Sequence, residues 1–258
     1  MQILDFSNLT EVVTFTLSLW GVVFLRYVLV AGIFYLVFYV FVKEKYWHRK
    51  ISDRLRTPYQ HWKEILWSCL TSFIFALSGV GLLWLWQEGY TNLYMDNSYP
   101  IIVSVGSLLM ALLAHETYYY WLHRWMHRPK IYRWIHKVHH DSIVTSPWTS
   151  FSFHPLESLL QAVVVPIVVV VLPMHIVAVL TMLSLMTISA TINHLDIEIY
   201  PKHFEKHWLG KWVIGATHHS LHHAKFRENF GLYFTFWDRW METESPEFEE
   251  LFREKTQD

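Results

Sequence analysis

Residues 156–194 read "LESLLQAVVVPIVVVVLPMHIVAVLTMLSLMTISATINH". This stretch holds two apolar runs, Leu156 to Leu172 and Met174 to Asn193, which are broken at Pro173 and contain no Lys or Arg. A helix of about 20 apolar residues crosses the roughly 30 Å hydrocarbon core of a bilayer. Because no polar loop separates the two runs, they predict a helical hairpin that dips through a membrane and brings His194 back to the side of entry.

Three further apolar runs are long enough to cross a membrane, namely Val12 to Val42, Ile65 to Trp86 and Pro100 to Leu122. Hydrophobic residues make up 53% of the chain and charged residues only 17%, which is typical of a membrane protein. We therefore expect an all-α integral membrane protein with about four to five membrane helical segments, the hairpin included.

The first apolar run is unusual in length and in charge. It is about 31 residues long, or roughly 46 Å as a helix, and Arg26 lies near its middle. A lone Arg side chain that faced lipid would be costly. We expect this helix to be strongly tilted, or split near Gly21 or Gly32, with Arg26 facing the helix bundle.

The charges of the connecting segments predict sidedness. Residues 1–11 and 87–99 contain no Lys or Arg, whereas residues 43–63, 123–140 and the region after Asn193 are basic. Basic segments stay on the cytoplasmic side of a membrane, here a bacterial inner membrane or the endoplasmic reticulum. The opening sequence "MQILDFSNLT" lacks the positive region of a cleavable signal peptide, so we expect the first run to remain as an anchor.

Histidine is concentrated in under half of the chain, with 15 of the 17 histidines between His115 and His223. The boxes "HRWMH", "HKVHH" and "HHSLHH" begin at residues 123, 136 and 218. Residues three or four apart share one face of a helix, so the imidazoles of a box lie within reach of one another. His194 ends the hairpin at the same level. Four separate segments are therefore predicted to converge in a cytoplasmic helical cap that holds a histidine-rich di-metal site.

The boxes and His194 supply more imidazoles than one ion can use, so two metal ions are implied. The candidate ligands are His123, His127, His136, His139, His140, His194, His218, His219, His222 and His223. Cys69 is the single cysteine, which excludes a thiolate cluster. Imidazole suits iron, zinc, copper and nickel alike, so the ligand set does not select the element.

Three stretches carry a resemblance to a known family: "ETYYYWLHRWMHRPKIYRWIHKVHH" (116–140), "SFHPLE" (152–157) and "THHSLHHAKFRENFGLYFTFWDRW" (217–240). Together they resemble the fatty acid hydroxylase and sterol desaturase superfamily of membrane di-iron oxygenases, and most closely its sterol C5-desaturase branch. Ser158 stands where a glycine usually follows the acidic residue of the second motif. We expect amino-terminal membrane helices and a cytoplasmic loop over residues 1–99, a catalytic domain over 100–243 and a polar tail over 244–258.

The resemblance implies two Fe ions, with zinc in their place after overexpression, and O2-dependent oxidation of a C–H bond in a membrane lipid. It also implies a cytochrome b5- or ferredoxin-type electron donor, for which the basic cytoplasmic segments Lys43 to Lys63 and Lys202 to Arg227 are available. Nucleic acid is not expected as a partner, because 21 basic residues balance 22 acidic ones. A fatty acyl or other lipid hydroxylase is the alternative, since hydroxylation and desaturation begin with the same hydrogen abstraction. A metal-binding transporter is the competing class, but transporters place their ligands near the middle of the bilayer.

Three residues outside the boxes are candidates for orienting the ligand rings. Glu116 lies seven residues before His123 and matches an acidic position of the family; the alternative is a carboxylate that caps a helix or faces solvent. Asp238 of "WDRW" is either such a residue or a plain turn residue. His154 of "FHPLE" either orients a ligand or fixes its loop through Pro155.

Overall fold

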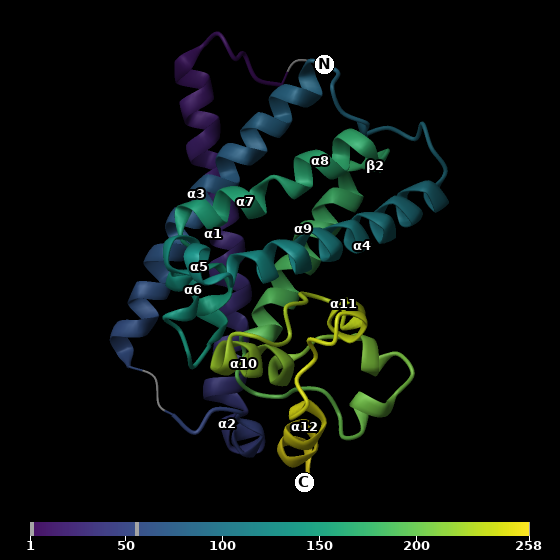
Figure 1. Ribbon diagram of the computed structural model, residues 1–258. Coiled ribbons are helices and arrows are strands. Elements are labelled where there is room, and N and C mark those ends of the chain that lie inside the picture. The colour runs from purple at the N-terminus through teal and green to yellow at the C-terminus, as the bar shows by residue number, and fades with distance from the viewer. Residues whose placement is uncertain (1–2, 55–56, 258) are drawn as a thin grey trace.

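The computed structural model describes residues 3–54 and 57–257, so Arg56 of the basic segment 43–63 lies outside the described residues. Four helices in these ranges are long and apolar enough to cross a membrane, and they run through the body of the molecule (Figure 1). They are α1 with its continuation η1 (Leu9–Leu36 and Val37–Phe41), α3 (Pro58–Gln87), α4 (Ile101–Met126) and α9 (Ile176–Asn193). The prediction of an all-α membrane protein is confirmed.

The predicted hairpin is formed by α9 and by two shorter helices in series, α7 (Pro155–Ala162) and α8 (Val164–Val171). Pro166 has no N–H to donate to the carbonyl of Ala162. The Ser78 hydroxyl of α3 donates to that carbonyl instead, at 3.1 Å. The apolar hairpin therefore contains a helix break whose freed carbonyl is satisfied by a neighbouring helix.

A short pairing of strands marks the turn of the hairpin. Strand β2 (Met174–His175) pairs in parallel with β1 (Leu93–Tyr94), which belongs to the acidic connection between α3 and α4. Figure 1 shows β2 at the end of the bundle opposite to α10. The turn of the hairpin and the connection 88–100 therefore lie together, far from the histidine boxes.

Helix α1 is continuous from Leu9 to Leu36, so the expected split near Gly21 or Gly32 does not occur. Nothing lies within 4 Å of a side chain added at Gly21, and only the ring of Trp148 approaches one at Gly32. The backbone changes later, at Val37, where the wider π-helical turn η1 begins. Neither glycine therefore breaks the helix.

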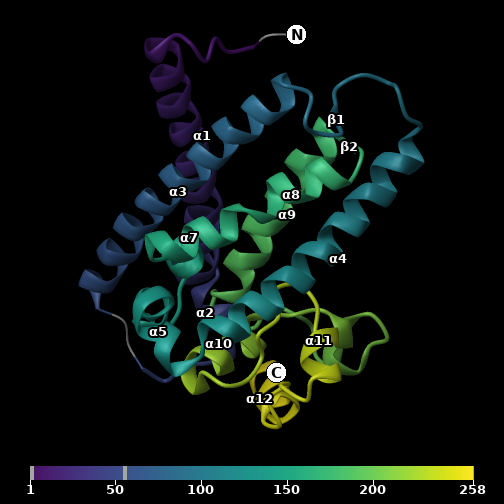
Figure 2. The ribbon, with the colours of Figure 1, turned by 45° about the horizontal axis from the view of Figure 1, so that its top comes forward.

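The opposite end of the bundle is a cap of short helices, which come from several separate segments of the chain (Figure 2). It contains α2 (Lys43–Tyr46), η2 (Trp47–Arg49), α5 (Pro129–Ile135), α6 (Lys137–His140), η4 (Phe204–Lys206), η5 (Gly210–Trp212), α10 (Ala216–Lys225), α11 (Phe236–Trp240) and α12 (Phe248–Thr256). The basic segment after α2 joins the cap, because Lys50 forms an ion pair with buried Asp196 at 3.0 Å. Basic segments thus gather at one end, and its cytoplasmic orientation stays a prediction.

The loop between α6 and α7, which includes η3 (Pro147–Phe151), is fixed to two membrane helices. The hydroxyl of Tyr27 in α1 donates to the Trp148 carbonyl at 2.8 Å. The fully buried carboxylate of Glu64 in α3 accepts hydrogen bonds from Ser142 at 2.7 Å and Thr149 at 2.9 Å. A buried carboxylate with several donors is well stabilised, so the backbone that follows α6 has a defined position beside the histidines.

Candidate metal centre

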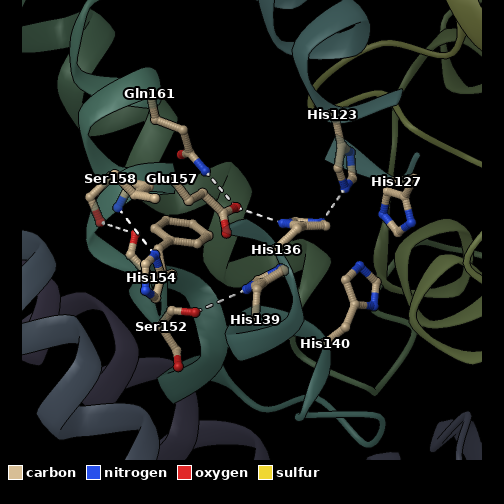
Figure 3. Close-up of polar contacts among 12 residues, drawn as sticks. His123, His127, His136, His139, His140, Ser152, His154, Glu157, Ser158 and Gln161 are labelled. Atoms are coloured by element: carbon tan, nitrogen blue, oxygen red, sulfur yellow. Dashed lines mark hydrogen bonds and ion pairs between the residues drawn. The ribbon is translucent and has the colours of Figure 1, made fainter. Parts of the chain in front are cut away.

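The imidazoles form two adjacent groups at the junction of the spans and the cap. Within each group, one nitrogen of every ring lies within 4.8 Å of the others. The first group is His123, His127, His136, His140 and His222, and the second is His139, His194, His219 and His223. All of these rings are buried except that of His127, which is partly exposed. Figure 3 shows four rings of the first group, with His139 of the second group beside His136.

The two HxxHH boxes are each divided between the groups. In α6 and its N-cap, His136 and His140 belong to the first group and His139 to the second. In α10, His219 and His223 belong to the second group and His222 to the first. Residues at i and i+4 therefore share a site, and the residue at i+3 is directed to the other site. The rings of each box remain in contact with one another, and each box contributes to both groups.

His194 joins the second group because it is the first residue after α9. Its Nδ1 donates to the Ala190 carbonyl at 2.6 Å, which fixes the ring at the helix end. Its Nε2 lies 3.2 Å from Nε2 of His139 and 2.9 Å from Nε2 of His219. The hairpin thus delivers one imidazole to rings that come from α6 and α10.

The hydrogen bonds made by the Nδ1 atoms show which form of each ring is present, and therefore whether its Nε2 can bind a cation. Nδ1 of His123 donates to the Phe230 carbonyl at 2.8 Å, and Nδ1 of His136 donates to Glu157 at 2.8 Å. Each Nε2 of a neutral ring then carries a lone pair, yet these two Nε2 atoms lie only 3.0 Å apart.

Lone pairs at that separation repel one another unless a cation attracts both. Imidazole nitrogens bound at 2.0–2.1 Å and at right angles to one another would lie about 2.9–3.0 Å apart. His139 and His194 repeat the pattern in the second group, since both donate through Nδ1 to carbonyls, of Ser152 and Ala190. The donor set of both groups therefore fits a transition-metal ion.

Burial keeps the rings neutral. Loss of hydration, together with the neighbouring imidazoles, holds the pKa of His139, His140 and His223 well below its ordinary value. Burial and the nearby His123 lower the pKa of His127 to about 2. Neutral imidazole is the form that binds metal, so these rings are available as ligands at neutral pH.

Glu157 orients a ligand ring, and sequence reasoning had not assigned it that role. Its buried Oε1 accepts the Nδ1 proton of His136 and is held in turn by the Gln161 amide at 3.0 Å (Figure 3). The signal was present in "SFHPLE", where the glutamate falls in the first turn of α7. A carboxylate behind a ligand histidine fixes the tautomer and raises the basicity of the ligand nitrogen.

Glu116 and Asp238 do not contact a ligand ring in the structure. Glu116 accepts from the backbone N–H groups of Leu232 at 3.1 Å and Tyr233 at 2.7 Å. Asp238 accepts from those of Phe230 at 2.8 Å and Gly231 at 2.9 Å. Both carboxylates therefore hold the backbone segment 230–233, whose Phe230 carbonyl accepts the Nδ1 proton of His123.

Two other candidates lie outside both groups. His154 is the N-cap of α7, where its Nδ1 accepts from the Leu156 N–H at 3.3 Å, in keeping with the alternative of a loop-fixing residue. The ring of His218 stacks on Phe248 of α12, with centroids 3.5 Å apart. Its Nε2 lies 3.6 Å from Glu244. The adjacent His219 faces the metal centre instead.

A largely apolar cavity inside the bundle ends at the second group. Its walls come from α1, α3, α4, α7, α8 and α9, and they include Val23, Leu82, Val165 and Leu183. His194 and Leu232 line the end nearest the imidazoles. An elongated apolar molecule that entered from the membrane would therefore meet the metal centre at this end.

Comparison with known proteins gives relatives of one kind. The model of the fatty acid hydroxylase family matches residues 108–243. Human lathosterol oxidase is 32% identical over 164 residues, which is 62% of this chain and 53% of the human protein. A Delta(7)-sterol 5(6)-desaturase of Gibberella zeae is 28% identical over 237 residues, which is 90% of this chain and 63% of that protein.

The chain thus spans about half to under two thirds of the length of these relatives. No solved structure matches it. The resemblance inferred from the histidine boxes, including its branch, is confirmed.

Proposed function

Because this chain belongs to the fatty acid hydroxylase family, we propose that it is a membrane-bound, O2-dependent di-iron oxidoreductase that oxidises a C–H bond of a membrane lipid, as a sterol desaturase does. One observation carries the proposal: two groups of buried imidazoles lie at the inner end of an apolar cavity between membrane helices. The printed names of the relatives, an oxidase and a desaturase of sterols, support the reaction class.

The first group would hold one ion and the second group the other. Iron held there would supply the redox chemistry by which dioxygen oxidises an unactivated C–H bond. The imidazoles alone do not select iron, so iron rests on the family, and zinc would replace it after overexpression.

The residues around the groups have separate tasks. Glu157 keeps the His136 proton on Nδ1, so that Nε2 remains a ligand atom. The carbonyls of Phe230, Ser152 and Ala190 do the same for three other rings. The apolar walls of the cavity exclude water, which protects a strong oxidant from side reactions.

Electrons would come from a cytochrome b5- or ferredoxin-type partner. Exposed basic side chains lie on α5 and α6, close to the ligands that these helices carry, and they include Lys130, Arg133 and Lys137. An acidic donor would be attracted to this face and would dock near the metal centre. The predicted cytoplasmic orientation of the cap agrees with a soluble or membrane-anchored donor on that side.

Hydroxylation of a fatty acyl chain or another lipid is the second candidate, which the family name favours. A transporter is disfavoured, because the imidazoles lie at the ends of the spans and in the cap, with most of them fully buried. Lipidomic comparison of cells with and without the protein under ¹⁸O2 distinguishes the two reactions. A desaturase yields a lipid with a new double bond and no label, and a hydroxylase yields a labelled alcohol.

The site assignment is tested in the same cells with a matched pair of variants. His139→Asn removes a ring from the second group and should abolish the lipid product. His203→Asn removes an exposed ring outside both groups, at a position with φ of 65° that Asn tolerates, and should preserve the product. A His139→Asn variant that still oxidised lipid at the full rate would overturn the proposal.

A further inference from the structure

Arg26 lies near the middle of α1, and its side chain lines the cavity that ends at His194. Leu19 and Val23 line the same cavity from the same face of the helix, at the spacing of one and two turns. The following residue, Tyr27, turns away and stacks on Phe151 with centroids 5.3 Å apart. Among the residues of α1 that line the cavity, Arg26 is therefore the one nearest to the cap.

This guanidinium has no protein partner within the part of the chain that the structure describes. Its Nε is buried without a hydrogen-bond partner, and no ion pair involves the side chain. No Asp or Glu is among the described residues that line the cavity. The polar side chains there, such as Ser78, Gln161 and Thr187, are uncharged.

A structural role does not account for such a charge. Arginine stays protonated in proteins, and an unpaired charge within a membrane span is costly. Arg26 lies about 15 Å along the helix before the end of α1 at Leu36, and its side chain faces the cavity. A charge kept at this position, facing a cavity, indicates a ligand that supplies the missing counter-charge.

We propose that Arg26 binds the anionic group of the lipid substrate, a carboxylate or a phosphate, and so holds one end of the lipid at a fixed place relative to His194. The inference rests on the proposed lipid oxidation and narrows its substrate to acidic lipids. A planar guanidinium matches two anionic oxygens through paired hydrogen bonds. The apolar walls then receive the hydrocarbon part of the lipid.

Binding to the detergent-purified protein tests the inference without any need for turnover. The probes are radiolabelled palmitate, hexadecyl phosphate and hexadecanol, which share a chain length and differ in the head group. The wild type should bind at least one anionic probe roughly 10-fold more tightly than hexadecanol, as expected for a charge-assisted hydrogen bond. The tighter of the two anionic probes identifies the head group.

Arg26→Gln should lose this preference, and Arg26→Lys should keep part of it, since Lys retains the charge without the paired geometry. Arg253→Gln removes an exposed arginine of α12 and should behave as the wild type. Arg26→Gln should still fold, because it removes an unpaired charge from a span and should not lower the melting temperature. Equal binding of hexadecanol and both anionic probes by the wild type would overturn the inference.

The position of oxidation gives a second test. With fatty acids of several chain lengths, the oxidised carbon counted from the carboxyl end should stay constant in the wild type and become variable in Arg26→Gln. A position that is constant from the methyl end instead would contradict the anchor. Preference for anionic probes without any lipid oxidation in cells would contradict only the proposed function, so the two failures are distinguishable.

Discussion

At the scale of single residues, the three buried carboxylates near the imidazoles accept hydrogen bonds from two different kinds of donor. Glu157 accepts a proton from a ligand ring, whereas Glu116 and Asp238 accept from backbone N–H groups of the segment 230–233. Burial raises the pKa of Asp238. The hydrogen bonds that its carboxylate accepts from Thr243 and from the backbone act in the opposite direction and only partly offset this rise. One carboxylate therefore tunes a ligand, and the other two position the backbone that supports another ligand.

Glu157→Gln should weaken metal binding about 10- to 100-fold, the range found when a carboxylate behind a ligand histidine is removed. The amide keeps the volume of the side chain and can still accept from His136, so the fold should persist. Competition with a chelator measures the affinity. Glu244→Gln changes an acidic residue beside His218, outside both groups, and should leave the affinity unchanged. Equal affinities of the Glu157→Gln variant and the wild type would show that Glu157 does not tune His136.

Spacing alone predicted which residue types would gather, but it could not separate His218 from its neighbours. In "HHSLHH" the pairs 218/222 and 219/223 have the same i,i+4 spacing, so the local pattern is ambiguous. The ring of His218 stacks on Phe248 of α12, which keeps it out of both groups. This is a tertiary contact, so the local spacing does not encode it. Glu116 lies two helical turns before His123, yet its carboxylate accepts from the backbone N–H of Leu232, a contact that spacing along the helix does not encode.

At the scale of elements, the divided boxes make α6 and α10 the bridge between the two groups. The α4 end and His194 each serve one group, whereas α6 and α10 serve both. The hairpin was predictable, because two apolar runs without Lys or Arg have few other solutions in a membrane. The break between α7 and α8 is predictable from Pro166, but the Ser78 hydroxyl that satisfies the freed carbonyl is not, because it depends on how α3 packs. The π-helical turn at Val37 has no comparable signal in the sequence.

His222→Asn should lower the metal content from about two ions per chain toward one, because its ring belongs to the first group and the other α10 ligands belong to the second. Elemental analysis of protein purified without chelator measures the content. His218→Asn is the matched control on the same helix and should keep both ions. Loss of an ion from His218→Asn with full retention in His222→Asn would reverse the assignment of these two rings.

At the scale of the whole molecule, the structure separates an acidic end, with β1, β2 and the connection 88–100, from a basic end that carries the cap. The apolar run lengths and the loop charges predicted this division. Which end faces the cytoplasm follows only from the positive-inside rule. The cavity between the ends could not be predicted, because its walls come from six helices whose packing the sequence pattern does not specify.

Single cysteines at positions 96 and 130, in a Cys69→Ser background, should label from opposite sides of the membrane. A membrane-impermeant maleimide added to intact cells or sealed vesicles should reach position 96 from the non-cytoplasmic face. It should reach position 130 only after permeabilisation. Labelling of both positions from one face would refute the arrangement of the four spans.

The order in which ligands appear along the chain has a consequence for biosynthesis. His222 completes the first group and His219 and His223 complete the second, so both groups wait for α10, the last ligand-bearing helix to be translated. By the time α10 has left the ribosome, all four spans have left it as well, because they precede α10 in the chain. If the two groups bind metal as proposed, the membrane spans are therefore made before either site can be complete.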